Sequence, residues 1–344
     1  MSHNLDRSGN LVHFADSRAD AWHQLGQQVG HAMTAAEAFD AAGLAGWNVR
    51  KMPLVIPQEP IITPDGVTTP LPVQVTDSWA TVRDNPITGT VDYLGVVGSK
   101  YTPVQNEESA RVLDAIVDEA GGARFETAGA LYGGRQTFLT MKLPKSMVID
   151  GSNGQHDRTD WYIAALNSHD GSQAFRLLLT GVRVVCANTQ EAAIRGCRSS
   201  FSIRHTANAR VAIHEARQAL GLSFAYIDAF SNEAAQMNAR EIEVEEFRRL
   251  AEQLTKVADA PSASARAKRR DHANGIVKLF VSSPSLTNLN PTRWAAYQAV
   301  TEYADHFMGQ GTKGNNADSR ALRTITSATV QKMKADAFNL LAVG

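Results

Sequence analysis

The sequence predicts an α+β fold, in which a part rich in antiparallel β-hairpins and short helices precedes a helical C-terminal part. Two apolar runs, Trp161–Leu166 and Ala174–Cys186, flank Asp170-Gly171, a dipeptide that favours the tight turn of a hairpin. A second pair of strand-like runs, 124–131 and 136–143, flanks a Gly-Gly turn. Beyond residue 206 the apolar residues follow helical spacing instead. Strands followed by helices are the α+β pattern.

The first 206 residues contain further elements of both kinds. Thr34 and Glu37 form a capping box that opens a short helix ending at Ala42. A proline-rich segment, 57–72, favours loops or edge structure. Asn106 is placed to cap a helix over 107–119, and Asn188 or Thr189 to cap another that ends at Arg195. We expect further strands at 47–56, 73–83, 91–97 and 201–204.

The C-terminal part is expected to be helical with one linker. Residues 258–265 consist of small residues and predict a linker, which is followed by the basic run Arg266–Arg270. We expect helices at 207–239, 241–256, 271–281, 291–307 and 318–341. The predicted organisation is therefore an N-terminal arm (1–30), a β-rich α+β core (31–206) and a helical region (207–344).

Composition restricts the class of protein. The chain of 344 residues is 43% hydrophobic and 20% charged, as expected of a globular protein with a substantial core. Its net charge of −1 argues against a uniformly basic nucleic-acid coat but permits a basic groove on a neutral body. Two cysteines make no disulfide framework. No apolar run approaches the length of a membrane span, so we expect a cytoplasmic protein without a membrane partner.

Arginine is concentrated around the central hairpin. From Arg176 to Arg217 there are seven arginines and two glutamates, a local balance of +5. Planar guanidinium groups around a groove would suit phosphate binding. Arg176 and Arg183 lie seven apart on one predicted strand and point to opposite faces unless a bulge at Gly181 shifts the phase. The alternative is structural, since Arg195 and Arg198 would favour the end of a helix.

Three other motifs contain residue types found in catalytic, metal-binding or phosphate-binding sites, but ordinary structural roles explain them better. Ser168-His169-Asp170 contains the residue types of a catalytic triad, but adjacent residues rarely meet the required geometry. Cys186 and Cys197 do not match a zinc spacing, so no metal is expected. Gly309, Gly311 and Gly314 only loosely match a phosphate loop, and no nucleotide or other cofactor is expected.

A set of short segments spread over most of the chain has a recognisable pattern: 22–26, 94–101, 126–129, 133–135, 167–172, 183–189, 203–206 and 288–306. Together these segments resemble a family of phage- and plasmid-related proteins that carry a domain of unknown function. The resemblance implies a phage, prophage or plasmid source and a cytoplasmic protein, without supplying catalytic residues.

The paired hairpins followed by a helix also resemble, remotely, the core of phage single-strand annealing recombinases of the Red-beta and Rad type. That resemblance implies a non-enzymatic protein that holds single-stranded DNA in a basic groove, as a homo-oligomer, with a phage or host replication or recombination protein as a further partner. The residues expected to bind nucleic acid are Lys100, Tyr101, Arg135, Lys142, Arg176, Arg183, Arg198, Arg204 and His205, with Tyr101 and His205 as stacking groups. Asn167, His169 and Asn188 are expected to order the loops.

Two alternative functions remain open at this point. One is a non-enzymatic phage structural or host-interaction protein that self-assembles. The other is a hydrolase that uses His169 and Asp170.

Overall fold

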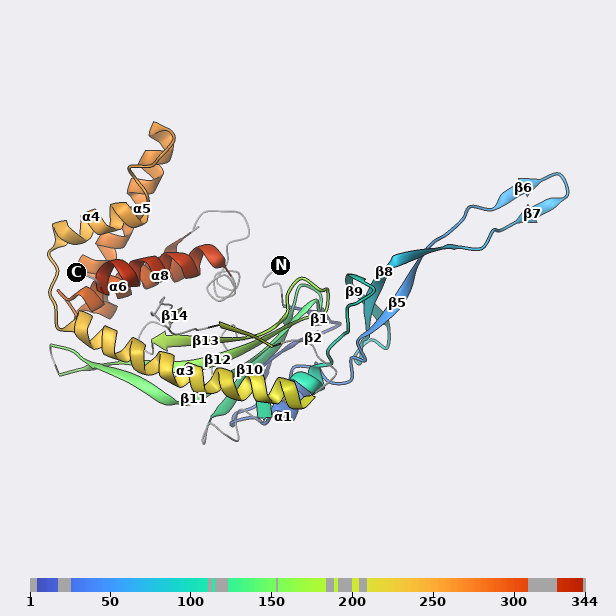
Figure 1. Ribbon diagram of the computed structural model, residues 1–344, viewed down its shortest axis with the longest axis horizontal. Helices are drawn as coiled ribbons and strands as arrows, with labels where there is room; N and C mark the ends of the chain where they lie inside the picture. Colours follow the sequence, from blue (N-terminus) through green and yellow to red (C-terminus); the bar gives the residue numbers. More distant parts are fainter. Residues whose placement is uncertain are drawn as a thin grey trace.

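The computed structural model describes residues 5–17, 26–110, 113–114, 123–152, 154–183, 189–190, 200–203, 209–308 and 327–342. These residues form the predicted α+β fold (Figure 1). A large sheet occupies the middle of the molecule, a long hairpin projects from one end, and a group of helices lies at the other end.

The main sheet is built around the two predicted hairpins. The first is β10 (Arg124–Leu131) with β11 (Gln136–Asp150), and the second is β12 (His156–Ser168) with β13 (Phe175–Arg183). β11 and β12 are longer than expected, so the predicted loop 150–158 shrinks to a turn between them. The sheet order is β14 (Thr189–Gln190), β13, β12, β11, β10, β3 (Phe14–Asp16), β4 (Gln27–Gln28), with β15 (Ser200–Ile203) also pairing with β13.

One face of this sheet is covered by the 30-residue helix α3 (Ala209–Asn238), which crosses the strands (Figure 1). Alternate residues of β12 point to this face, as the period of a strand requires. Trp161 of β12 packs edge-on against Phe230 of α3, with ring centroids 5.2 Å apart. The same hydrophobic cluster continues from the sheet into the C-terminal helices, so sheet and helices share one core.

Residues 7–28, expected in an N-terminal arm, contain four short strands. β1 (Arg7–Ser8) pairs with β2 (Leu11–Val12), and β3 joins the main sheet beside β10. Helix α1 (Ala35–Ala41) follows, with Thr34 as the N-cap and the predicted capping box in place. The N-terminal segment therefore completes the main sheet.

A second sheet contains β5 (Arg50–Ile56), β8 (Val73–Asp84) and β9 (Val91–Gly98). β5 and β8 continue past the end of β9 as a two-stranded hairpin, which closes with β6 (Ile61–Thr63) and β7 (Gly66–Thr68) inside the predicted proline-rich loop. We call residues 52–78 the arm, which is distinct from the predicted N-terminal arm of residues 1–30. It projects far from the rest of the chain (Figure 1).

The helical part is α4 (Val244–Leu254), α5 (Ala263–Ser282), the 3₁₀ turn η1 (Pro284–Leu286), α6 (Arg293–Glu302), the π-helical segment η2 (Tyr303–Phe307) and α8 (Ala328–Ala342). The predicted linker 258–265 is wrong at its C-terminal end. Ser262 caps α5 and accepts a hydrogen bond from the Ala265 N–H, so the basic run Arg266–Arg270 is helical. None of the described helices is long and apolar enough to cross a membrane.

Candidate nucleic-acid interface

Three segments meet at the end of the main sheet where β10 turns into β11 and β12 turns into β13. The Tyr101 hydroxyl donates a hydrogen bond to the Ser168 carbonyl (2.9 Å). The His169 N–H donates to the Arg135 carbonyl (2.8 Å). We call these segments, residues 98–101, 132–135 and 168–173, the turn cluster.

Close backbone approach holds the turn cluster together. A Cβ on Gly95 of β9 would lie 2.6 Å from the Asp170 Cβ and 2.8 Å from its Cα, so only glycine allows this contact. Gly171 has φ +76°, and a Cβ there would lie 3.1 Å from Val97. The second sheet thus packs directly on the predicted Asp170-Gly171 turn.

Cations and aromatic residues occur together in the turn cluster and in the adjoining strands β5 and β8 of the second sheet. Lys100 and Arg135 are exposed and form no ion pair with any described residue. Lys51 donates to the Ser99 carbonyl (2.7 Å), and its Nζ lies 5.5 Å from the ring centroid of Trp79. We define the basic–aromatic strip as Lys51, Trp79, Lys100, Tyr101, Tyr132 and Arg135.

Tyr132 presents an exposed aromatic ring from a strained turn. Its φ is +55°, a left-handed conformation that costs a non-glycine residue about 1 kcal/mol or more, and Gly133 and Gly134 continue in the same region. The ring remains 41% exposed. Strain and exposure of this kind concentrate at binding sites.

The carboxylate in the turn cluster is already engaged. Burial raises the pKa of Asp170, but hydrogen bonds from Ser168 and Ser172 outweigh this effect and hold the pKa below its usual range. Burial, together with the nearby Asp170, raises the pKa of Tyr101 to about 12. Tyr101 therefore stays a hydrogen-bond donor, and Asp170 stays an acceptor, at neutral pH.

A buried polar network supports the turn cluster from below. The Arg83 guanidinium stacks 4.0 Å from the Trp47 ring centroid and binds Asp6 (2.7 Å) and Asp92 (3.0 Å). Trp47 in turn contacts the His169 ring, with centroids 5.8 Å apart. Because Arg83 and Trp47 are almost fully buried, this network fixes the turns and does not itself meet solvent.

Ser168, His169 and Asp170 do not form a triad. The Ser168 hydroxyl donates to Asp170 (2.6 Å), whereas His169 Nε2 faces the Asn106 Oδ1 at 3.0 Å and the ring has no exposed surface. The Asn106 amide is directed to the Leu44 carbonyl, and Asn106 is itself helical, so it does not cap the helix as predicted. Asn167 accepts a hydrogen bond from the Ser168 N–H and is also buried.

Two predicted phosphate ligands lie on the main sheet. Lys142 forms an ion pair with Asp160 (2.6 Å), and Asp160 also binds Arg158. Much of the positive charge of Lys142 is therefore neutralised. Burial raises the pKa of Asp160, but the hydrogen bonds from Lys142, Ser146 and Arg158 lower it overall. Arg176 donates to the Gln173 side chain (2.5 Å) and so lies beside the turn cluster.

The remaining predicted residues are described only in part or not at all. β12 and β13 pair without interruption from Leu166–Arg176 to Thr159–Arg183, so the bulge that could have shifted the phase at Gly181 is absent. The backbone of Arg183 is described, whereas Asn188, Arg198, Arg204 and His205 lie outside the described residues. Thr189 and Gln190 form β14 and not the start of the expected helix, whose remaining positions lie outside the described residues, as do both cysteines.

The structure places several residues predicted from the sequence at one end of the main sheet, but the sequence did not predict all of their neighbours. The predicted residues there are Lys100, Tyr101, Arg135, Asn167, His169 and Arg176. Lys51 and Trp79 come from strands distant in sequence, and no local signal places them beside Lys100. Tyr132 does follow from the sequence as a candidate stacking group, because it adjoins Gly133-Gly134 in a predicted turn, and turns run over the protein surface. Within the described part of the chain, no three His, Cys, Asp or Glu side chains are grouped to hold a metal ion.

One protein family matches most of the chain. Residues 93–335, more than half of the chain, match the model of a domain of unknown function, DUF932. The chain belongs to the DUF932 family. The DUF932 match begins within β9 and includes the turn cluster, both hairpins of the main sheet and most of the helical part, whereas Lys51, Trp79 and the arm precede it. No curated protein and no solved structure is significantly similar to the chain.

Proposed function

We propose that this DUF932 protein is a non-enzymatic single-stranded-DNA-binding protein of a phage or plasmid that promotes strand annealing in recombination or replication. The observation that carries the proposal is the basic–aromatic strip, which combines exposed cations, Lys100 and Arg135, with aromatic residues on neighbouring turns and strands. Proteins that bind single strands without sequence preference combine a cationic path for the backbone with rings on which bases stack.

The order of elements supports the same proposal. Two hairpins, β10–β11 and β12–β13, precede the long helix α3, as expected from the resemblance to single-strand annealing recombinases. In this proposal Lys100, Arg135 and Arg176 hold phosphates at the turn cluster. Tyr101 and Tyr132 stack on bases.

Lys142 is already paired with Asp160, and the position of Arg183 is on the opposite face of β13 from that of Arg176, so neither is assigned a phosphate here. Arg198, Arg204 and His205, which lie outside the described residues, keep the roles expected from the sequence.

The salt dependence of binding provides a quantitative test. Each phosphate neutralised on a single strand contributes about 0.7 to the slope of log K against log salt. Four contacts, from Lys51, Lys100, Arg135 and Arg176, would give a slope of about −2.8. Affinity would then fall about 50-fold between about 50 and 200 mM salt. Fluorescence anisotropy of a labelled single-stranded oligonucleotide, with a duplex competitor, measures both quantities.

Two variants separate charge from stacking. Lys100→Ala/Arg135→Ala should weaken binding about 10- to 100-fold and halve the salt slope. Tyr132→Ala should weaken binding about 5- to 150-fold and leave the slope unchanged, because a stacked ring releases no counterions. Lys145→Ala/Lys332→Ala, which removes the same charge from exposed ion pairs elsewhere, is the control. No binding, or an unchanged slope in Lys100→Ala/Arg135→Ala, would refute the assignment.

Annealing is tested separately from binding. Two complementary oligonucleotides, one with a fluorophore and one with a quencher, should pair faster with the wild-type protein than with Lys100→Ala/Arg135→Ala. Tight binding without acceleration would leave single-strand binding in place and remove the annealing activity.

One observation favours the second candidate function, a self-assembling structural or host-interaction protein. The arm exposes aliphatic side chains along its length, and surfaces of this kind mark protein–protein contacts. Assembly in the absence of nucleic acid, with no affinity for single strands, would favour this second function over the first.

A further inference from the structure

The arm has no support from the rest of the described chain. No side chain from Met52 to Ser78 is buried, and β9 pairs with β8 only from Ser78 onward. An isolated two-stranded hairpin is at best marginally stable in water, so the arm needs a surface to pack against. Its exposed large aliphatic residues are Met52, Val55, Ile56, Ile61, Ile62, Val67, Leu71 and Val73.

The amount of exposed apolar surface points to a binding role. Ile62 is 81% exposed and Leu71 is 88% exposed, near the turn of the arm. At roughly 60–120 Å² for a fully exposed aliphatic side chain, the eight residues together present on the order of 400 Å². Because consecutive strand residues such as Ile61 and Ile62 point to opposite faces, this apolar surface lies on both sides of the hairpin, and exposed apolar surface on this scale often marks a binding site.

Prolines exclude one way of docking. Pro53 lies within β5, and Pro57, Pro60, Pro70 and Pro72 lie in the stretches that join the two paired ends of the arm. Proline lacks the N–H that a neighbouring strand would need, and natural edge strands use it to prevent strand addition. The arm must therefore dock through its side chains.

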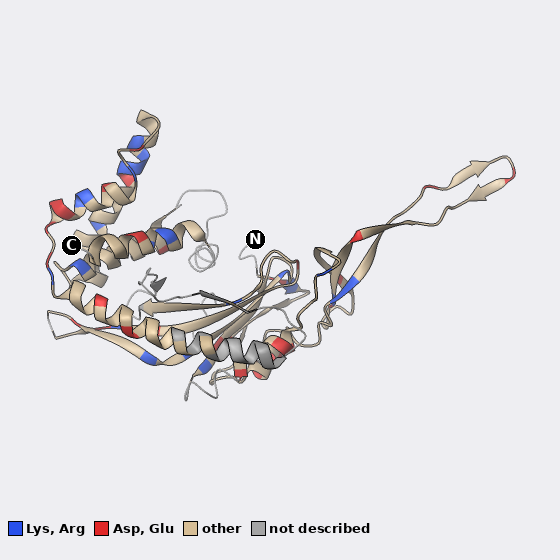
Figure 2. Cartoon of the chain, in the orientation of Figure 1, with Lys and Arg blue, Asp and Glu red and all other residues tan. Residues whose placement is uncertain are grey.

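The charge of the arm restricts its partner. Between Met52 and Trp79 there are three carboxylates, Glu59, Asp65 and Asp77, and neither lysine nor arginine (Figure 2). Such a segment repels nucleic acid and anionic lipid, and two such arms repel each other. The complementary surface is basic and belongs to something other than another arm.

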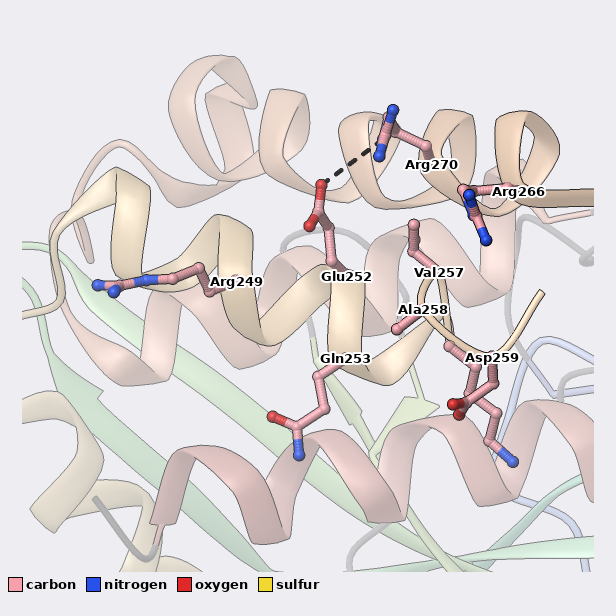
Figure 3. A pocket seen from close by; sticks show the side chains of 9 residues that line it. Arg249, Glu252, Gln253, Val257, Ala258, Asp259, Arg266 and Arg270 are labelled. Atoms are coloured by element: carbon pink, nitrogen blue, oxygen red, sulfur yellow. Dashed lines mark ion pairs between the residues drawn. The ribbon is translucent and has the colours of Figure 1, made fainter. Parts of the chain in front are cut away.

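A basic pocket lies between α4 and α5 (Figure 3), two helices at the end of the molecule opposite the arm (Figure 1). It has a volume of about 610 Å³ and is lined by Arg249, Glu252, Gln253, Lys256, Val257, Ala258, Asp259, Arg266 and Arg270. Glu252 is engaged by Arg270 at 3.9 Å. Arg249, Lys256 and Arg266 form no ion pair with any described residue.

We propose that the arm of one copy docks at the α4–α5 pocket of a second copy, with Glu59 and Asp65 paired to the free cations of that pocket. The arm and the pocket lie at opposite ends of the long axis of the molecule (Figure 1). The contact is therefore head to tail, and repetition of it produces a ring or a filament.

Two variants each disable one side of the contact. The arm-shortened variant replaces residues 57–72 by Asn-Gly, because Ile56 and Val73 are paired and a two-residue turn can join them. The pocket variant is Arg249→Glu/Arg266→Glu. The control is Arg248→Glu, a single charge reversal on the same helix but outside the pocket, where Arg248 pairs with Glu245. Circular dichroism checks that each variant is folded.

Sedimentation velocity without nucleic acid gives the result. The wild type and Arg248→Glu should form assemblies that grow with concentration, and each disabled variant alone should be monomeric. An equal mixture of the two should give a 1:1 dimer and nothing larger, because only one arm and one pocket remain competent. Glu59→Lys/Asp65→Lys combined with Arg249→Glu/Arg266→Glu in one chain should restore assembly.

Three results would overturn the proposal. The first is a wild type that stays monomeric at about 100 µM, well above the dissociation constants of specific protein complexes. The second is self-association of the pocket variant alone, which would indicate contact between arms. The third is undiminished assembly of the arm-shortened variant, which would show that the arm is not needed. Loss of affinity for single-stranded DNA in a pocket variant that still assembles would, in addition, assign the basic pocket to nucleic acid.

Discussion

Replacement of Arg83 by methionine should destabilise the protein more than any surface change, because it leaves a buried carboxylate without its partner. Arg83 and Asp6 are 2% and 6% exposed and 2.7 Å apart. The other partner, Asp92, is 30% exposed and can be solvated when Arg83 is lost. Asp6 is too deeply buried to be solvated, so most of the free-energy cost of removing Arg83 arises at Asp6.

The magnitude follows from the burial of the pair. Removing one member of a buried ion pair costs about 3–5 kcal/mol, and the stacking on Trp47 contributes about 1 kcal/mol within that range. With an unfolding entropy of about 2.1 cal/mol/K per residue, a chain of 344 residues unfolding as one unit loses about 4–7 °C in Tm.

Differential scanning calorimetry of Arg83→Met and Asp6→Asn/Arg83→Met tests this reasoning. The double variant removes the stranded charge and should regain about 2 kcal/mol of the loss. A fall in Tm of less than about 2 °C for Arg83→Met, or identical Tm values for the single and double variants, would show that the pair does not hold the N-terminal strands to the second sheet.

Three further predictions concern pH, packing and the helical part. Burial lowers the pKa of His13 below 6.5, although Asp6 raises it, so the unfolded state binds the proton more tightly. The unfolding free energy should therefore fall as pH drops below 6.5, by at most about 1.4 kcal/mol per pH unit. Denaturant titrations between pH 6.5 and 5 measure this fall, and the part of it that is due to His13 should be absent in His13→Gln. Gly95→Ala should lower the free energy of unfolding by about 1–3 kcal/mol in thermal melts and weaken single-strand binding, because the new Cβ displaces the turn at Asp170. Unchanged stability and affinity would contradict the close approach of Gly95 to Asp170. Lys334→Met strands Asp305, its buried partner at 2.5 Å, and should cost about 3–5 kcal/mol, whereas Lys332→Met on the exposed face of α8 should change Tm little.

Local signals in the sequence predicted the hairpins and the first helix well. The apolar runs around Asp170-Gly171 and Gly133-Gly134 and the capping box at Thr34 each depend on residues close together in the chain. α5 begins earlier than expected because residues 263–270 consist of alanine, serine, lysine and arginine. They lack an apolar stripe, although alanine, lysine and arginine favour helix. The hairpin β6–β7 was missed because the prolines around it favoured a loop.

The candidate site was only partly predictable, since contacts distant in sequence decide it. His169 reads as a possible catalytic residue, and only the packing of Trp47 and Asn106 around it shows that it is enclosed. Lys142 reads as a phosphate ligand, but the cross-strand register places it beside the carboxylate of Asp160. Lys51 reached the site through the pairing of β5 with β8, which no local pattern specifies.

The arm leaves and re-enters the second sheet through neighbouring strands, with Met52 opposite Ala80. The segment between those two positions has ends that are already adjacent, so the length and sequence of residues 54–77, which do not pair with β9, can vary without altering the register of β5, β8 and β9. The DUF932 match begins only beyond this segment, in β9. Such an element can be exchanged between chains as a unit, so that a new arm would alter the binding partner while the sheet and its turns stay the same.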